Sequence, residues 1–241
     1  MKLLLLSNSA THARPYLSHA LDAIQRYTAG ISTSLLFVPY ALGDHESYTE
    51  KVSRALQPLG LSVDGLHRYD DPVQAVRSCE AVFVGGGNTF RLLRTLRKLD
   101  LINPLREAIG AGALYIGSSA GTNVACPTIR TTNDMPIVDP GGFDALSLVP
   151  FQINPHYLDA VAESTHQGET RSQRISEFCE DNDVPVLAMR EGAWLEVVNA
   201  DASLLGEHGA VLFRPGGTSA EVAAGSDVSP LLSTVPRFSR D

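Results

Sequence analysis

The chain has 241 residues, of which 44% are hydrophobic and 19% charged, and its formal charge is 19 − 27 = −8. This length suits one large α/β domain with a full core, so we expect residues 1–241 to form a single domain, with a loosely held tail from about 226. The acidic balance, with no basic cluster longer than Arg97-Lys98, argues against binding to nucleic acid or to an anionic membrane surface.

The N-terminal and cysteine patterns indicate a cytoplasmic protein. The apolar run at 3–6 is shorter than the apolar region of a signal peptide, and no run reaches the length that crossing a bilayer needs. The three cysteines, Cys79, Cys126 and Cys179, are widely spaced and show no metal-like pairing. We therefore expect a reducing compartment, no membrane partner, and neither a metal nor a cofactor.

Short apolar runs alternate with amphipathic stretches along the first half of the chain. The runs expected to form strands are 3–6, 35–38, 61–66, 81–84 and 113–116. Apolar residues at helical spacing predict helices around 17–27, 52–59, 73–76 and 90–96. This alternation predicts βαβ units, and hence an α/β fold with a mostly parallel sheet flanked by helices on both faces.

The second half of the chain is less regular. Residues 131–142 are expected to form a long loop, and Thr170 and Gln173 have the spacing of a capping box for a helix through Phe178. The apolar runs expected to form strands here are 151–156, 184–189, 193–198 and 210–213, with a hairpin turn at 199–201.

The stretch Gly117-Ser118-Ser119-Ala120-Gly121 follows an apolar strand and precedes a stretch that can start a helix. Gly-x-Ser-x-Gly in this context is typical of a nucleophile elbow, where a serine sits on a sharp turn between small neighbours. Ser119 is then the candidate nucleophile. The N–H of Ala120, with that of Gly86 or Gly87, would stabilise an oxyanion. The motif alone leaves an ordinary Gly/Ser turn as the alternative.

A serine nucleophile needs a base, and the base needs an acid that orients it. Among the seven histidines, His156 lies at a predicted strand end, where the site residues of open sheets gather, and His166 could lie at the surface or in the site. Asp134, Asp139 and Glu191 are the candidate acids. Chain order cannot decide among them, because a triad is defined by its geometry.

Four motifs in this order resemble those of the peptidase E, or α-aspartyl dipeptidase, family, to which the cyanophycinases are related. They are 84–90 (VGGGNTF), 115–123 (YIGSSAGTN), 131–136 (TTNDMP) and 154–157 (NPHY). The resemblance runs from the first strand to about Phe213 and implies the flavodoxin-like fold of class I glutamine amidotransferases. It also implies a serine peptidase that hydrolyses dipeptides with an N-terminal aspartate through an acyl-enzyme.

The resemblance implies roles for particular residues of this chain. The hydrolytic set is Ser119 as nucleophile, His156 as base, Glu191 as acid, and Gly87 and Ala120 as oxyanion donors. Asn88 and Asp134 would bind substrate, and triad membership of Asp134 stays open. Specific binding of an aspartate side chain requires a fixed cation, and arginine suits this role because its guanidinium fork matches a carboxylate. Arg171 is the first candidate, and Arg174 lies one turn further on.

Other classes of function stay open. The chain could be a cyanophycinase-like peptidase or an esterase with the same triad, or a non-catalytic relative in which Ser119 only hydrogen-bonds a ligand. We expect a small peptide as its partner, and homo-oligomer formation is compatible with the sequence.

Overall fold

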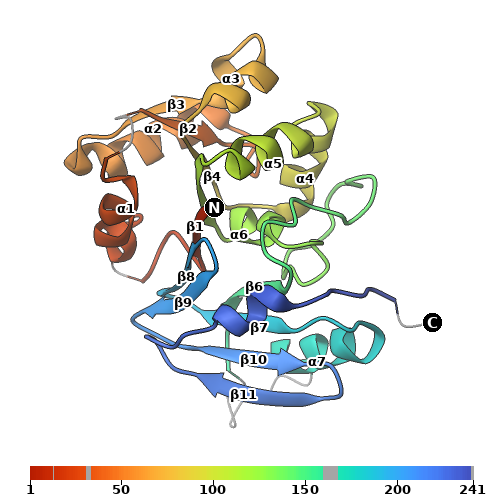
Figure 1. The fold of residues 1–241 in the computed structure, drawn as a ribbon. Coiled ribbons are helices and arrows are strands. Elements are labelled where there is room, and N and C mark those ends of the chain that lie inside the picture. Colours follow the sequence, from red (N-terminus) through yellow and green to blue (C-terminus); the bar gives the residue numbers. More distant parts are fainter. Residues whose placement is uncertain (13, 31–33, 160–167, 240–241) are drawn as a thin grey trace.

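The structure is a computed structural model that describes residues 1–12, 14–30, 34–159 and 168–239. Its strands form two sheets that meet near the middle of the molecule (Figure 1). No helix in these ranges is both long and apolar enough to cross a bilayer.

The larger sheet has seven described strands in the order β3-β2-β4-β5-β1-β8-β9. Its parallel strands are β1 (Lys2–Leu6), β2 (Ser34–Val38), β3 (Ser62–Gly65), β4 (Ala81–Val84) and β5 (Leu114–Ser118). The hairpin of β8 (Ala193–Val198) and β9 (Asp201–Gly206) adds two antiparallel strands beside β1. The predicted mostly parallel sheet is confirmed.

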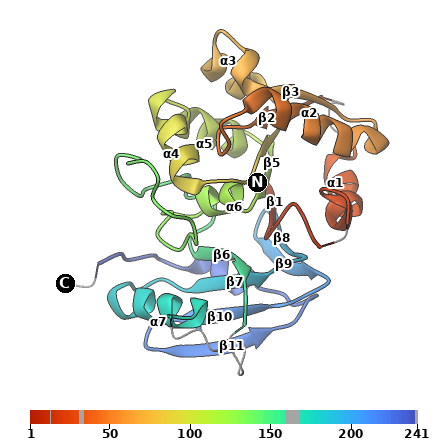
Figure 2. The same cartoon turned by 180° about the vertical axis from the view of Figure 1, so that it is seen from behind.

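Helices cover both faces of the larger sheet, because alternate side chains of each parallel strand enter different cores. In β1, Leu3 and Leu5 belong to one core and Leu4 and Leu6 to the other. The first core receives α3 (Pro72–Ser78), α4 (Thr89–Lys98), α5 (Ile102–Gly110) and α6 (Ala120–Ala125). The second receives α1 (Leu21–Thr28) and α2 (His45–Leu56), on the opposite side of the sheet (Figures 1 and 2).

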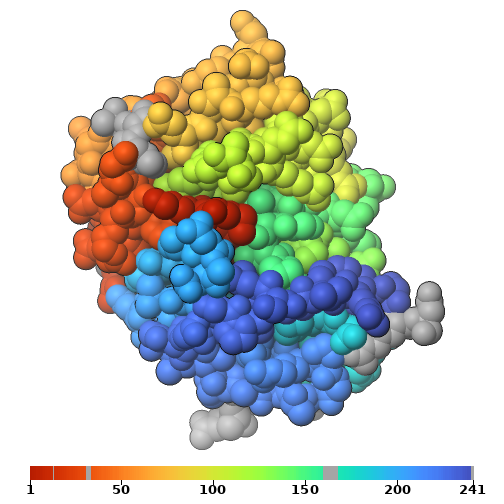
Figure 3. Space-filling model, viewed as in Figure 1, coloured from red at the N-terminus to blue at the C-terminus, as the bar shows by residue number. Residues whose placement is uncertain are grey.

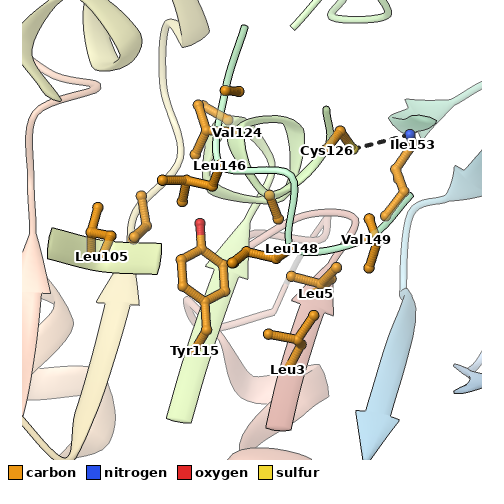
Figure 4. Close-up of a cluster of buried hydrophobic side chains, with 14 of the residues drawn as sticks. Leu3, Leu5, Leu105, Tyr115, Val124, Cys126, Leu146, Leu148, Val149 and Ile153 are labelled. Carbon is orange, nitrogen blue, oxygen red and sulfur yellow. Dashed lines mark hydrogen bonds between the residues drawn. The ribbon is translucent and has the colours of Figure 1, made fainter. Parts of the chain in front are cut away.

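The first core connects the sheet to the start of α6. Tyr115 stands among Leu3, Leu5 and Leu105 (Figure 4), and its hydroxyl donates to the carbonyl oxygen of Gly121 at 2.6 Å. All of these side chains are fully buried, so the sheet and the start of α6 are held in one packed layer.

The smaller sheet has the order β11-β10-β7-β6. Its strands are β6 (Gln152–Tyr157), β7 (Val186–Arg190), β10 (Ala210–Arg214) and β11 (Thr218–Val222). One face packs on α7 (Arg171–Asp181), while Leu187, Met189 and Leu212 on the other face belong to the first core of the larger sheet. The two sheets therefore share apolar side chains where they meet.

The segment from about 226 runs across the boundary between the two sheets, where it is the dark blue band of Figure 3. Val228 is buried, and Leu231 and Leu232 pack against the first core. Asp183 and Arg237 exchange backbone hydrogen bonds of 2.8 and 3.2 Å. The single domain over residues 1–241, with its loose tail, stays a prediction.

Candidate active site

Ser119 lies on the turn between β5 and α6, at the carboxyl end of the larger sheet. Its backbone has φ 53° and ψ −107°, a conformation that costs an ordinary residue on the order of 1–3 kcal/mol. The N–H of Ser119 donates to the carbonyl oxygen of Leu6 at 3.1 Å, which ties this turn to β1. The strand, the sharp turn and the helix predicted around Ser119 are all present.

The glycines on either side of Ser119 allow the strand and the helix to approach closely. A Cβ on Gly117 would lie 2.7 Å from the carbonyl oxygen of Gly121. A Cβ on Gly121 would overlap the carbonyl oxygen of Val84 in β4. Both neighbours are backbone atoms that cannot rotate away, so the spacing Gly-x-Ser-x-Gly is required by packing at this turn.

His156 and Glu191 reach Ser119 from the smaller sheet. His156 belongs to β6, and Glu191 follows the last residue of β7. The Nε2 atom of His156 lies 3.0 Å from Ser119 Oγ, and its Nδ1 atom lies 2.7 Å from Glu191 Oε1. A hydroxyl, an imidazole and a carboxylate in hydrogen-bonded sequence form the arrangement that activates a serine for attack on a carbonyl carbon.

Two polar residues directly after β1 hold this arrangement in place, and sequence reasoning missed both as site residues. His156 has φ 55°, and its N–H donates to Ser7 Oγ at 2.9 Å, while that hydroxyl donates to the carbonyl oxygen of Met189 at 3.0 Å. Asn8 Oδ1 accepts the N–H of Gly192, next to Glu191, at 2.8 Å. Their position at the carboxyl end of a parallel strand was the available signal.

The other acids considered in the sequence lie apart from the imidazole. Asp134 Oδ2 accepts from the N–H and the hydroxyl of Thr89, at 2.7 and 2.6 Å, at the start of α4. Asp139 Oδ1 accepts the N–H of Gly141 in its own loop at 2.8 Å. His166 lies outside the described residues. The geometry thus pairs the imidazole with Glu191.

Asn88 caps α4, and it is not among the residues that line the cavity at Ser119. Its Oδ1 atom accepts the N–H of Arg91 at 3.0 Å, and its Nδ2 atom donates to the carbonyl oxygen of Met135 at 2.9 Å. The amide therefore joins the helix N-terminus to the loop that carries Asp134. The structure shows this capping role for Asn88, and its expected contact with substrate stays a prediction.

Gly86, two residues after the end of β4, lies beside Ser119. A Cβ on Gly86 would lie 3.1 Å from Ser119 Cβ. The backbone of Gly86 hydrogen-bonds the Tyr48 hydroxyl, whose pKa is raised well above its usual range by burial. The N–H groups of Gly87 and Ala120 have no acceptor among the described residues, as the donors of an oxyanion hole require.

Ser119 and His156 open into a cavity of about 490 Å³. Among the described residues, the other charged ones in its lining are Lys51, Asp134 and Arg171. Arg171 is the first residue of α7, and the predicted capping box of that helix is confirmed by reciprocal hydrogen bonds between Thr170 and Gln173.

The guanidinium of Arg171 lies in the cavity wall and forms no ion pair with the described residues. Its Nη1 atom is buried and has no hydrogen-bond partner in the described part of the chain. Burial lowers the pKa of Arg171, and the charge of nearby Glu191 acts in the opposite direction. Arg174, by contrast, is exposed and lies 3.5 Å from Glu169. Of these two arginines, Arg171 is therefore the one that can meet an anionic group inside the cavity.

The chain matches the family model described as peptidase family S51 over residues 3–205. It is 53% identical over 238 residues to a protein named peptidase E from Streptomyces coelicolor, covering 99% of this chain and 98% of that protein. It is 51% identical over 233 residues to a protein named probable alpha-aspartyl dipeptidase from Drosophila melanogaster, covering 95% and 97% of the two chains.

Two solved structures share the fold. A putative peptidase E protein from Listeria monocytogenes superposes with a TM-score of 0.65 at 24% identity, covering 85% of this chain and 98% of that one. A peptidase from an acI-B1 actinobacterium superposes with a TM-score of 0.67 at 14% identity, covering 94% and 96%. The α/β architecture described above is thus shared with both of these structures.

Proposed function

The chain belongs to peptidase family S51, and from this premise we propose that it is a serine-type dipeptidase that hydrolyses Asp-X dipeptides. The observation that carries the proposal is the hydrogen-bonded series Ser119, His156 and Glu191 at the edge of a cavity that also holds Arg171. The names of the Streptomyces and Drosophila relatives support the same substrate class.

In the proposed mechanism, the turn at Ser119 acts as a nucleophile elbow. His156 Nε2 takes the hydroxyl proton while Ser119 Oγ bonds to the carbonyl carbon of the aspartyl residue. Glu191 holds Nδ1 and stabilises the imidazolium. The N–H groups of Gly87 and Ala120 receive the negative charge on the carbonyl oxygen, a stabilisation of roughly 3 kcal/mol per donor.

The acyl-enzyme then forms and breaks down by the same proton path. The imidazolium gives its proton to the leaving nitrogen, and residue X departs with a free amine. A water molecule, deprotonated by the same imidazole, attacks the ester carbon, and the Ser119 oxygen leaves with the proton returned by His156. The products are free aspartate and residue X, and the triad is restored.

The cavity supplies partners for the charged groups of the aspartyl residue. Arg171 binds the side-chain carboxylate, because its buried Nη1 has no other partner among the described residues. Asp134 binds the α-ammonium: Thr89 and Thr132 donate to its Oδ2 atom only, which leaves Oδ1 for the ligand. Asn88 fixes the loop of Asp134 beside this site.

The test is the release of free aspartate from Asp-Leu by the wild-type protein and by Ser119→Ala. We expect hydrolysis by the wild type and a loss of at least about 1,000-fold in kcat for the variant, because the nucleophile acts in every turnover. Retained turnover in Ser119→Ala would refute the role of Ser119. Hydrolysis of simple esters or longer acidic peptides in preference to Asp-Leu would instead favour the esterase or cyanophycinase-like alternatives.

We place this activity in the cytoplasm, with a small peptide as its partner and with neither nucleic acid nor a membrane. Three free cysteines and an acidic composition support that setting. Size-exclusion chromatography with light scattering tests for the homo-oligomer.

A further inference from the structure

Lys51 is a second cation of the cavity, and the proposed function leaves it without a role. It belongs to α2, which packs on the larger sheet, whereas Arg171 begins α7 on the smaller sheet. The two helices lie far apart, on opposite sides of the region where the sheets meet, in both views of the ribbon (Figures 1 and 2). Lys51 and Arg171 thus approach the same cavity from different sides.

A continuous wall leads from the nucleophile to Lys51. Gly86 borders Ser119, and its backbone hydrogen-bonds the hydroxyl of Tyr48. That hydroxyl lies 3.2 Å from the hydroxyl of Tyr16, and the Nζ atom of Lys51 lies 4.3 Å from the centroid of the Tyr16 ring. A cation over an aromatic face is attracted to it, which restricts where the lysine head can lie.

No group in this wall neutralises Lys51. No described carboxylate pairs with its ammonium. Burial raises the pKa of both Tyr16 and Tyr48, so both hydroxyls are neutral at physiological pH. The positive charge is therefore available to an anionic group that enters the cavity from solution.

The charges of the cavity match those of a whole dipeptide. An Asp-X dipeptide carries two carboxylates and one ammonium at neutral pH. Besides His156, the described residues of the lining provide two cations, Arg171 and Lys51, and one carboxylate, Asp134. Arg171 and Asp134 are matched by the aspartyl residue, which leaves Lys51 and the C-terminal carboxylate of residue X as the remaining pair.

We propose that Lys51 binds the C-terminal carboxylate of residue X and thereby selects dipeptides over longer peptides. This assignment rests on the proposed function and deepens it. The carboxylate stands one residue beyond the scissile bond, a span of about 3.5 Å along an extended chain. In a longer peptide a neutral peptide bond takes that place, and the ammonium of Lys51 loses its partner.

The experiment compares two substrates that differ only in that group, Asp-Leu and its C-terminal amide. It uses wild type, Lys51→Met, Lys51→Arg, and the control Lys98→Met, which removes an exposed lysine of α4 outside the cavity. For wild type we expect kcat/KM on Asp-Leu to exceed that on the amide about tenfold. Lys51→Met should lose about tenfold on Asp-Leu, mostly through KM, and change less than about twofold on the amide.

Each result decides the proposal. A substrate preference that is abolished in Lys51→Met, restored in Lys51→Arg and unchanged in Lys98→Met supports it; activity retained on the amide also shows that the variant is folded. Equal wild-type activity on the two substrates overturns it, as does an equal loss on both in Lys51→Met. A wild-type protein that hydrolyses neither substrate overturns the proposed function, and the assignment falls with it.

Discussion

Arg171→Met should change activity and stability in opposite directions. Methionine keeps an unbranched apolar stem in the cavity wall and removes the guanidinium. The Nη1 atom of Arg171 is buried with no hydrogen-bond partner in the described part of the chain. An unsatisfied buried polar group costs about 1–3 kcal/mol. The arginine is therefore retained at a cost to the folded state, and substrate removes that cost.

The expected magnitudes follow from these contacts. Two charge-assisted hydrogen bonds to a substrate carboxylate contribute about 1.5–3 kcal/mol each. Since the guanidinium is only partly buried, we take the lower end, about 3 kcal/mol, which is roughly 100-fold in kcat/KM. Removing the unsatisfied group should raise the free energy of unfolding by about 1 kcal/mol, or about 2–4 °C in Tm for a chain of this size.

The assay measures kcat/KM for Asp-Leu and Ala-Leu, together with thermal unfolding, in wild type and in Arg171→Met. The control is Arg174→Met, which removes an exposed arginine of the same helix that pairs with Glu169. We expect the control to change both quantities little. If Arg171→Met keeps the preference for Asp-Leu, Arg171 does not read the aspartate. If it lowers Tm, the guanidinium is already satisfied in the free protein and the reasoning fails.

Three further changes have defined outcomes. Glu191→Gln should lower kcat about 100- to 10,000-fold with little change in Tm, because its half-exposed carboxylate orients and stabilises the imidazole of His156. Ser7→Ala should lower the free energy of unfolding, measured in urea, by about 1–3 kcal/mol and kcat about tenfold, since the N–H of His156 loses its acceptor. Burial raises the pKa of Cys126 from 9.0 to about 12, so its thiol stays protonated in the folded state and ionises on unfolding above about pH 9. Wild type should lose stability as the pH rises from 9 toward 12, and urea unfolding at about pH 8 and about pH 10.5 should show a smaller loss in Cys126→Ala.

Elements with a strong local pattern could be predicted from the sequence, and those without one could not. The buried parallel strands are continuous apolar runs, as strands covered on both faces must be. Helix α5 was not predicted, because Pro104 lies within it and Gly110 ends it, and both residue types are typical of turns. Proline is nevertheless tolerated in the first turn of a helix, where the N–H groups have no partners within the helix. Strand β11 has almost no buried side chain and is recognised only by its pairing with β10.

The same distinction holds for the candidate site: residues beside a local sequence signal could be predicted, and residues without one could not. Ser119 and His156 were predicted because each stands beside a local signal, a glycine motif and a strand end. From the residues alone the partner of the imidazole could not be chosen among Asp134, Asp139 and Glu191, and only the family resemblance pointed to Glu191. In the structure, the position of the smaller sheet separates these candidates. Ser7 was not predicted as a site residue, because it accepts a hydrogen bond from His156, which lies 149 positions further along the chain.

The catalytic residues proposed above are divided between the two sheets. The nucleophile stands on the larger sheet, and the imidazole and carboxylate on the smaller one, so the distance of 3.0 Å from His156 Nε2 to Ser119 Oγ depends on how the sheets pack. Leu187 and Met189 of β7 pack into the first core of the larger sheet. The relative position of the two sheets is therefore determined by apolar contacts. Ser7 then fixes what apolar contacts cannot, because its one hydroxyl joins the end of β1 to both β6 and β7 in defined directions. A conservative change in this shared core should therefore reduce kcat before it unfolds the protein.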